Sequence, residues 1–371
     1  MGHIARPTRM CSRARGRKNA GRGHVQAFRC RVAALFVCAA VAQAAVSGCA
    51  PAPRQVSVIM TCKQYPQLLL TDGTVVCWDQ PVGAGRAELY VASGAGARRV
   101  GLFRSPGQMN QPITATGFVS AVSEFAGGAH PDVLVYDLTA RTCEVLVRDA
   151  AIYPSPYSVS PDGRRLLVRP FQSGVGLQSI DLRNRQAKSL ARNVTVWDAV
   201  WGRGGASVVY ACTPHSDPKS IRVYEVKLAS MQGKNVWSAP LDAVSKPRCS
   251  PDGRNIAYIT SDQLACHSLK SGQRWAVARG RPADLDYVWS PDGSRLAVLA
   301  TGDSAELSVF DVVSRTIEKV PLDSGDGVVY PLGWLPDNKH FLVKIVDIRP
   351  HQHQIVAVTL LGKGNQAQRV R

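Results

Sequence analysis

From about residue 55 to the end of the chain, apolar runs of strand length alternate with short polar turn segments. Three stretches are near copies of one another, namely 157–168, 247–258 and 287–298, and each has Ser-Pro-Asp-Gly at its centre. Pro presets φ for the first turn position, Asp hydrogen-bonds its own backbone, and Gly supplies the left-handed residue. This pattern predicts strand, tight turn, strand. Two further stretches, 199–210 and 333–343, are degraded versions of the same unit.

A second hairpin with a polar turn is predicted after each of these units. The seven second hairpins are Glu88–Phe103, Val133–Val147, Leu177–Leu190, Arg222–Trp237, Leu264–Ala278, Leu307–Val320 and Gln354–Val370. Equivalent residues recur every 42 to 48 positions, and Leu68–Trp78 and Ile113–Val122 supply the two remaining first hairpins in weaker form. Seven units of four strands each predict an all-β fold, a seven-bladed β-propeller over residues 56–371, with six or eight blades as alternatives.

Through its Ser-Pro-Asp-Gly hairpins at Ser160–Gly163, Ser250–Gly253 and Ser290–Gly293, the chain resembles the TolB-like branch of the WD-repeat-type β-propellers. The resemblance covers roughly residues 60–360 and implies the fold. It implies little about function, because many unrelated roles use this scaffold.

Two segments are candidates for the last outer strand. The final blade ends either on residues 366–371 or on Val56–Met60, which would cross over from the other end of the chain. The N-terminal segment is the better β-former, so we favour a seam that joins both ends of the propeller.

Topology assigns the loops of a four-stranded blade to two faces. The Ser-Pro-Asp-Gly turns join the first two strands and lie on one face, where we expect Asp162, Asp252 and Asp292 to form turns. Trp201, Trp289 and Trp334 precede equivalent turns and are expected in the core between blades. The longer, varied loops lie on the other face, the predicted recognition face. Its candidate residues are His130, Phe171, His215, Asp217, Arg281, Tyr287, His351 and His353.

The N-terminus has the pattern of an export signal. Residues 1–48 contain nine basic and no acidic residues and end in the uncharged stretch Val32–Gly48. Val46-Ser47-Gly48-Cys49 resembles the bacterial lipobox, which implies cleavage before Cys49 and its lipidation. We therefore expect a cleaved signal peptide at 1–48, a lipidated Cys with a short tether at 49–55, and an exported protein anchored to a membrane. An uncleaved signal-anchor and ordinary secretion are the alternatives.

Six cysteines remain in the region that follows Cys49, and six allow 15 pairings. The close pair Cys62 and Cys77 is the preferred disulfide in an oxidising compartment. No C-x-x-C occurs, and sequence indicates no third ligand for His351 and His353, so we expect neither a metal nor a cofactor.

Net charge does not indicate a nucleic-acid partner. The formal charge is +18, but half of it belongs to residues 1–48, and the remaining basic residues form no stripe with interleaved aromatics. The chain also lacks the G-x-S-x-G motif of a hydrolase nucleophile elbow.

These observations favour a monomeric, non-enzymatic, lipid-anchored protein whose propeller serves as a binding or scaffold module for a protein or an envelope polymer. The alternative is a propeller enzyme of the lyase, lactonase or sugar-processing type with a site in the axial channel. Such an enzyme needs charged side chains that several blades contribute near the axis.

Overall fold

The structure is a computed structural model. It describes residues 56–62, 65–70, 72, 74–78, 86–93, 96–104, 106, 109–114, 116–122, 130–153, 158–172, 174–301, 305–320, 322, 327–346, 353–359 and 368–369. The chain divides into two units, Met1–Arg31 and Val32–Arg371, and every described residue belongs to the second. The predicted signal peptide and Cys49 lie outside the described residues, so both stay predictions.

The described strands form seven antiparallel sheets, which we number in chain order. Sheet 1 contains β2 (Tyr65–Leu69), β3 (Val75–Trp78), β4 (Arg86–Ser93) and β5 (Gly96–Arg104). Sheet 2 contains β6 (Met109–Thr114), β7 (Gly117–Val122), β8 (Asp132–Asp137) and β9 (Thr142–Val147). Sheet 3 contains β10 (Ala150–Ile152), β11 (Arg165–Pro170), β12 (Val175–Asp181) and β13 (Ala187–Arg192). Sheet 4 contains β14 (Val194–Trp201), β15 (Ser207–Pro214), β16 (Ser220–Lys227) and β17 (Gln232–Pro240). Sheet 5 contains β18 (Ser245–Cys249), β19 (Asn255–Ile259), β20 (Gln263–Ser268) and β21 (Arg274–Arg279).

Sheets 6 and 7 depart from simple chain order. Sheet 6 contains β22 (Leu285–Trp289), β23 (Arg295–Thr301), β24 (Ala305–Asp311) and β25 (Thr316–Val320), with β29 (Gln368–Arg369) added at its edge. Sheet 7 contains β26 (Val328–Trp334), β27 (His340–Val346), β28 (His353–Thr359) and β1 (Val56–Cys62). The described part also holds two short 3-10 helices, η1 (Arg203–Gly205) and η2 (Leu241–Ala243). No helix in it is long and apolar enough to cross a membrane.

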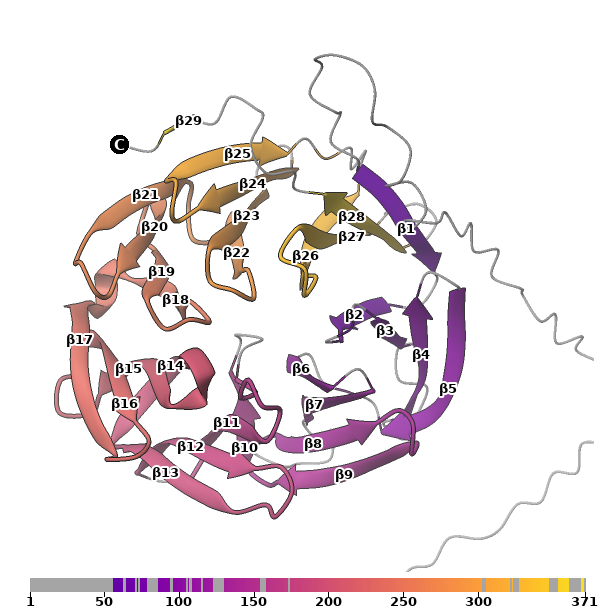
Figure 1. Cartoon of the computed structure of the whole chain (residues 1–371), viewed down its shortest axis with the longest axis horizontal. Coiled ribbons are helices and arrows are strands. Elements are labelled where there is room, and N and C mark those ends of the chain that lie inside the picture. Colours follow the sequence, from indigo (N-terminus) through magenta and orange to yellow (C-terminus); the bar gives the residue numbers. More distant parts are fainter. Residues whose placement is uncertain are drawn as a thin grey trace, which may run out of the picture. The chain divides into compact units, whose positions relative to one another are not determined.

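The seven sheets stand around a common centre, as the predicted propeller requires (Figure 1). In sheets 1 to 6 the first strand in chain order is the innermost, and the later strands follow toward the rim. In sheet 7 the innermost strand is β26, and β1 lies at the rim. Apolar side chains fill the space between neighbouring sheets. For example, Ala257 and Leu264 of sheet 5 belong to the same buried cluster as Leu296 and Phe310 of sheet 6. The core is therefore a series of layers between sheets, and burial between neighbours holds each sheet in place.

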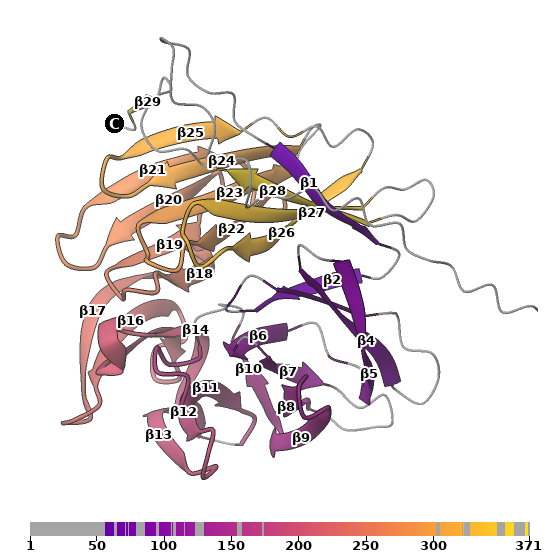
Figure 2. The ribbon, with the colours of Figure 1, turned by 45° about the vertical axis from the view of Figure 1, so that its right-hand side comes forward.

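The two ends of the propeller meet in sheet 7. Strand β1 pairs antiparallel with β28, with Val56 opposite Val358 and Cys62 opposite His353 (Figures 1 and 2). The predicted seam is therefore confirmed. The predicted hairpin Gln354–Val370 is wrong, because the partner of β28 on that side is β1, and β29 pairs instead with β25. The N-terminal strand provides seven residues for this edge of β28, whereas β29 has only two.

The three Ser-Pro-Asp-Gly turns have one common geometry. Each Ser Oγ donates to the turn Asp at 2.5 to 2.7 Å and accepts a backbone N–H five residues further on at 2.8 to 2.9 Å. The turn glycines have φ of 67 to 70°. Asp162, Asp252 and Asp292 therefore form turns, as predicted.

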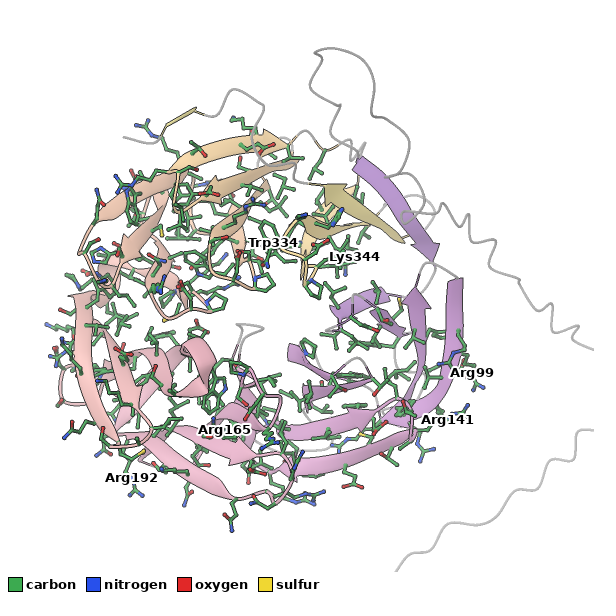
Figure 3. All side chains as sticks on the ribbon, viewed as in Figure 1. Arg99, Arg141, Arg165, Arg192, Trp334 and Lys344 are labelled. Carbon is green, nitrogen blue, oxygen red and sulfur yellow. The ribbon has the colours of Figure 1, made fainter. Side chains whose placement is uncertain are left out.

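The tryptophans that precede these turns connect neighbouring sheets. Trp201 Nε1 donates to Ser158 O at 2.7 Å, Trp289 Nε1 donates to Arg248 O at 3.1 Å, and Trp334 Nε1 donates to Val288 O at 3.1 Å. In each pair the acceptor lies two residues before the Ser of the preceding repeat. All three rings are at most 5% exposed, so the predicted position in the core between sheets is confirmed. Figure 3 shows Trp334 toward the centre, whereas Arg99, Arg141 and Arg192 lie at the rim.

Candidate functional site

The innermost strands carry large apolar side chains that are exposed. Trp197 on β14 is 43% exposed, and Val328 and Tyr330 on β26 are 41% and 47% exposed. Trp197 sits at a β-bulge, since the register with β15 shifts between Val196 and Asp198. Bulges of this kind redirect a side chain and are common beside functional sites. The indole is held in place because its Nε1 donates to Thr213 Oγ1 at 2.9 Å.

Three consecutive inner strands carry a charged residue at the same repeat position. Asp198, Lys246 and Asp286 each lie four residues before the first residue of the following turn, on β14, β18 and β22. Arg248 lies two residues beyond Lys246 on β18. We call Trp197, Asp198, Lys246, Arg248 and Asp286 the inner-strand cluster.

Hydrogen bonds across the sheets fix the cations of this cluster. Lys246 Nζ donates to Leu285 O at 2.9 Å, and Arg248 Nη2 donates to Asp286 Oδ1 at 3.2 Å. Arg248 Nη1 also donates to Tyr287 O, and its guanidinium carbon lies 5.0 Å from the centroid of the Tyr287 ring. Because Arg248 is planar and held on several sides, it is preorganised for a fixed partner. Lys246 is exposed and has two further N–H donors beyond the one that faces Leu285.

The carboxylates of the cluster occupy different environments. Asp198 is fully buried, and its Oδ2 accepts a hydrogen bond from the Cys249 backbone N–H at 2.8 Å. Asp286 has a side chain that is 41% exposed, and its Oδ1 accepts from the Tyr287 backbone N–H at 2.8 Å as well as from Arg248. Asp286 is therefore the carboxylate of the cluster that a ligand in solution can reach.

Two reactive groups beside the cluster are held in their neutral forms. Burial raises the pKa of the Tyr287 hydroxyl well above its usual range; Arg248 opposes this shift, and Asp198 and Asp286 add to it. Burial likewise raises the pKa of the Cys249 thiol, and the Asp198 and Cys212 side chains raise it further. A buried thiol with a raised pKa is a poor nucleophile. Any chemistry of the cluster therefore falls to Lys246, Arg248 and Asp286.

Most of the predicted recognition residues lie in the expected loops but in separate groups. His130 and Phe171 stack with ring centroids 4.1 Å apart. Asp217 forms an ion pair with Arg222 at 2.7 Å, and hydrogen bonds from Ser220 and Arg222 lower its pKa.

The remaining described candidates also have partners nearby. His215 is exposed, with its Nε2 3.4 Å from Thr195 Oγ1. Arg281 pairs with Asp284 at 2.7 Å. Within the described residues, no hydrogen bond or ion pair joins the His130–Phe171, Asp217–Arg222 and Arg281–Asp284 pairs to one another.

Tyr287 is a correction to the predicted recognition face. It has no exposed surface, and its hydroxyl donates to the carbonyl groups of Lys246 and Ala257 in the neighbouring sheet. The inner strand already begins at Leu285, so the side chain points into the core between sheets rather than into solvent. The side chains of His351 and His353 and that of Cys62 lie outside the described residues, so the Cys62–Cys77 disulfide stays a prediction.

The sequence alone places Trp197, Asp198 and Asp286 in connections of the predicted recognition face, but it does not group them with Lys246 and Arg248. Alignment of the repeats on their turns places Asp198, Lys246 and Asp286 in one column. Each of these residues, taken alone, looks like an isolated charged residue in a strand. The residue types around Trp197 do not predict the β-bulge there. In the described part of the chain, no three His, Cys, Asp or Glu side chains group as metal ligands.

Comparison with known proteins supports the propeller fold. No family model matches the chain. An oligogalacturonate lyase solved with manganese superposes with a TM-score of 0.56 at 13% identity, over 83% of this chain and 94% of that one. The β-propeller domain of Cps50 (Swd1) from Myceliophteria thermophila gives a TM-score of 0.51 at 12% identity, over 82% of this chain and all of the domain. At these identities the likeness establishes the fold, a β-propeller.

Two further similar proteins also have enzyme names. A puromycin hydrolase superposes with a TM-score of 0.53 at 14% identity, over 80% of this chain and 52% of that one. In sequence, 115 residues are 30% identical to YuxL of Bacillus subtilis (strain 168), an uncharacterized peptidase. This match spans 28% of the present chain and 17% of that protein. The expectation of a non-enzymatic protein is contradicted by these comparisons, which point to propellers of the enzyme type.

Proposed function

We propose that this chain is a propeller enzyme that acts on an acidic oligosaccharide at the inner-strand cluster. The observation that carries the proposal is the placement of Lys246, Arg248 and Asp286 on two adjacent inner strands, with the exposed indole of Trp197 on the strand before them. Cations bind the carboxylates of such a substrate, and an exposed aromatic ring offers an apolar face to a sugar ring. The name of the oligogalacturonate lyase supports the substrate class and the reaction type.

Within this proposal the three charged residues have different tasks. The Lys246 ammonium binds a substrate carboxylate with the donors that do not face Leu285. Arg248 holds Asp286 in one orientation through the 3.2 Å hydrogen bond, and Asp286 accepts the proton that the substrate or an attacking water gives up. The glycosidic C–O bond breaks, and the leaving sugar oxygen takes up a proton from solvent water. The lyase structure contains manganese, whereas the described residues here show no group of side chains that fits a metal.

We further propose that the seven sheets are the seven blades of one propeller. Seven sheets with four strands each, closed by β1, support this count, and β29 is an addition to sheet 6. The lipobox at Cys49 supports an exported enzyme held at a bacterial membrane by its N-terminal lipid. Such an enzyme would meet saccharides of the envelope or the surroundings.

The test is an assay of the purified chain on oligogalacturonates and other acidic oligosaccharides. Release of reducing ends measures cleavage, and ultraviolet absorbance of an unsaturated product separates elimination from hydrolysis. Asp286→Asn should lower kcat/KM by about 100-fold or more, because it removes the proton acceptor and keeps the shape. Lys246→Gln should raise KM more than it lowers kcat, since binding of the carboxylate is lost.

Arg281→Gln is the matched control, because it removes an exposed cation of a loop outside the cluster. It should leave kcat/KM within about twofold of the parent value. Full activity of Asp286→Asn, or no cleavage of any acidic oligosaccharide by the parent protein, would contradict the proposal.

A further inference from the structure

A hollow of about 410 Å³ lies on the face formed by the turns, away from the predicted recognition face. Turns of four consecutive sheets, 3 to 6, line it. Three prolines at the same turn position, Pro161, Pro251 and Pro291, supply apolar ring surface. This volume is within the usual range for sites that bind small molecules.

One of the four repeats that line the hollow departs from the pattern. The turn of sheet 4 has Gly202 and Gly204 where the turns of sheets 3, 5 and 6 have Ser and Asp, and both glycines line the hollow. The turn itself is kept, since the Gly205 N–H donates to Gly202 O at 2.9 Å, as Gly253 does to Ser250 O at 2.8 Å. A Cβ on Gly204 would meet no atom within 4 Å. The space that an Asp side chain occupies elsewhere is therefore open here.

The walls of the hollow carry an excess of negative charge. Asp252 and Asp292 line it from equivalent positions of sheets 5 and 6, and Arg254 is the cation that lines it. The two turns pack directly, because a Cβ on Gly293 would lie 2.9 Å from Asp252 Cγ. Burial raises the pKa of Asp292, but hydrogen bonds from Ser290 and Ser294 outweigh burial, so the pKa is lowered and the carboxylate is charged at neutral pH.

The contact between Arg254 and Asp252 is loose. Arg254 Nε lies 3.8 Å from Asp252 Oδ2, and the Arg254 side chain is 63% exposed. A long exposed ion pair of this kind contributes little and is readily exchanged. Among the described side chains that line the hollow, two carboxylates stand against one exposed guanidinium, which leaves one negative charge for a ligand to balance.

We propose that this hollow binds an organic cation, an ammonium or guanidinium group that lies against Asp252 and Asp292 with its aliphatic part on the proline rings. A ligand with one positive charge matches the charge of the walls. No residue of the inner-strand cluster lines the hollow. It does not depend on the proposed enzymatic activity.

The probe is n-butylguanidinium, titrated calorimetrically into the full chain in detergent, with the neutral isostere n-butylurea as comparison. The guanidinium should bind, and the urea should bind at least about tenfold more weakly. A capped Gly-Arg-Gly peptide distinguishes the sources of the cation. Binding of the peptide identifies a basic side chain as the ligand, whereas binding of the free guanidinium alone identifies a small metabolite.

The double variant Asp252→Asn with Asp292→Asn keeps the turn acceptors and removes the charge, and it should weaken guanidinium binding by about tenfold or more. Asp162→Asn is the matched control, because Asp162 has the same role in the turn of sheet 3 but does not line the hollow. Gly204→Asn fills the open space with a residue that tolerates positive φ, and should also abolish binding. Absence of guanidinium binding, equal binding of the urea, or full binding by both the double variant and Gly204→Asn would overturn the proposal.

Discussion

At the residue scale, one type of hydrogen bond, from a tryptophan indole to a backbone carbonyl, recurs between neighbouring sheets. The indole N–H of Trp201, Trp289 and Trp334 in each case reaches a backbone carbonyl of another sheet, in a layer from which water is excluded. A buried carbonyl that loses its donor keeps the full cost of desolvation. These tryptophans therefore act as directional links in an otherwise non-directional apolar core.

Trp289→Phe tests this role. Phe keeps most of the buried ring and leaves Arg248 O without the indole donor, so the free energy of unfolding should fall by about 1–2 kcal/mol. Urea unfolding measures the change. Trp197→Phe is the comparison, because its indole bonds Thr213 Oγ1 at a position that is 43% exposed, and its loss should cost less. Equal losses in the two variants would show that ring volume, not the hydrogen bond, matters.

At the residue scale, the sequence predicted the role of a residue where that residue type has a strong preference for one local geometry. Pro, Asp and Gly have strong turn preferences, so the roles of Asp162, Asp252 and Asp292 were readable. Tyr287 was not, because burial depends on which way a strand faces its neighbour. The inner-strand cluster was missed for a related reason, since its members meet only when three sheets stand side by side.

At the scale of secondary-structure elements, the sequence predicted β-hairpins well. Six of the seven predicted second hairpins correspond to adjacent strand pairs, such as β16 with β17. The prediction of the seventh hairpin was wrong because the partner strand of β28 comes from the other end of the chain. The residues around β28 do not indicate such a distant pairing. The weaker preference of residues 366–371 for strand was the available clue.

Deletion of β1 tests the seam. Removal of Val56–Cys62 exposes an edge of β28 along seven residues and should lower the Tm strongly and broaden the thermal transition, because sheet 7 loses its outer strand. Removal of residues 368–371 is the matched control, since β29 pairs with β25 through only two residues. That truncation should leave the Tm nearly unchanged. A similar Tm for the parent and the β1 deletion, measured by circular dichroism, would refute a structural role for the seam.

The whole molecule combines a propeller with an export signal that only sequence supports. Half of the net charge of +18 belongs to residues 1–48. Among the basic residues labelled at the rim in Figure 3, Arg99 and Arg141 lie near each other and Arg192 lies apart from them. Along the sequence the remaining basic residues form no stripe with interleaved aromatics, so we expect no nucleic-acid partner. We therefore expect the location of the protein in the cell to depend on Cys49 rather than on the surface of the propeller.

Cys49→Ser tests that address. Without the thiol no thioether to the lipid forms, so the protein should move from the membrane fraction to the soluble exported fraction, or remain uncleaved. Fractionation of the producing cells and the mass of the mature N-terminus measure this. Cys62→Ser is the control and should stay with the membrane. An unchanged membrane fraction for Cys49→Ser would indicate an uncleaved signal-anchor.

The pairing of β1 with β28 also constrains the order in which the sheets can form. A chain is made, and on the proposed route exported, N-terminus first, so its N-terminal segments become available for folding before its C-terminal ones. Sheets 1 to 6 need only consecutive segments for their four main strands, so each can form once its own segment is available. Sheet 7 cannot, because its outer strand is among the first segments made and its partner among the last. We therefore expect β1 to stay unpaired until residues 353–359 are available, and the pairing of β1 with β28 to be a late step of folding.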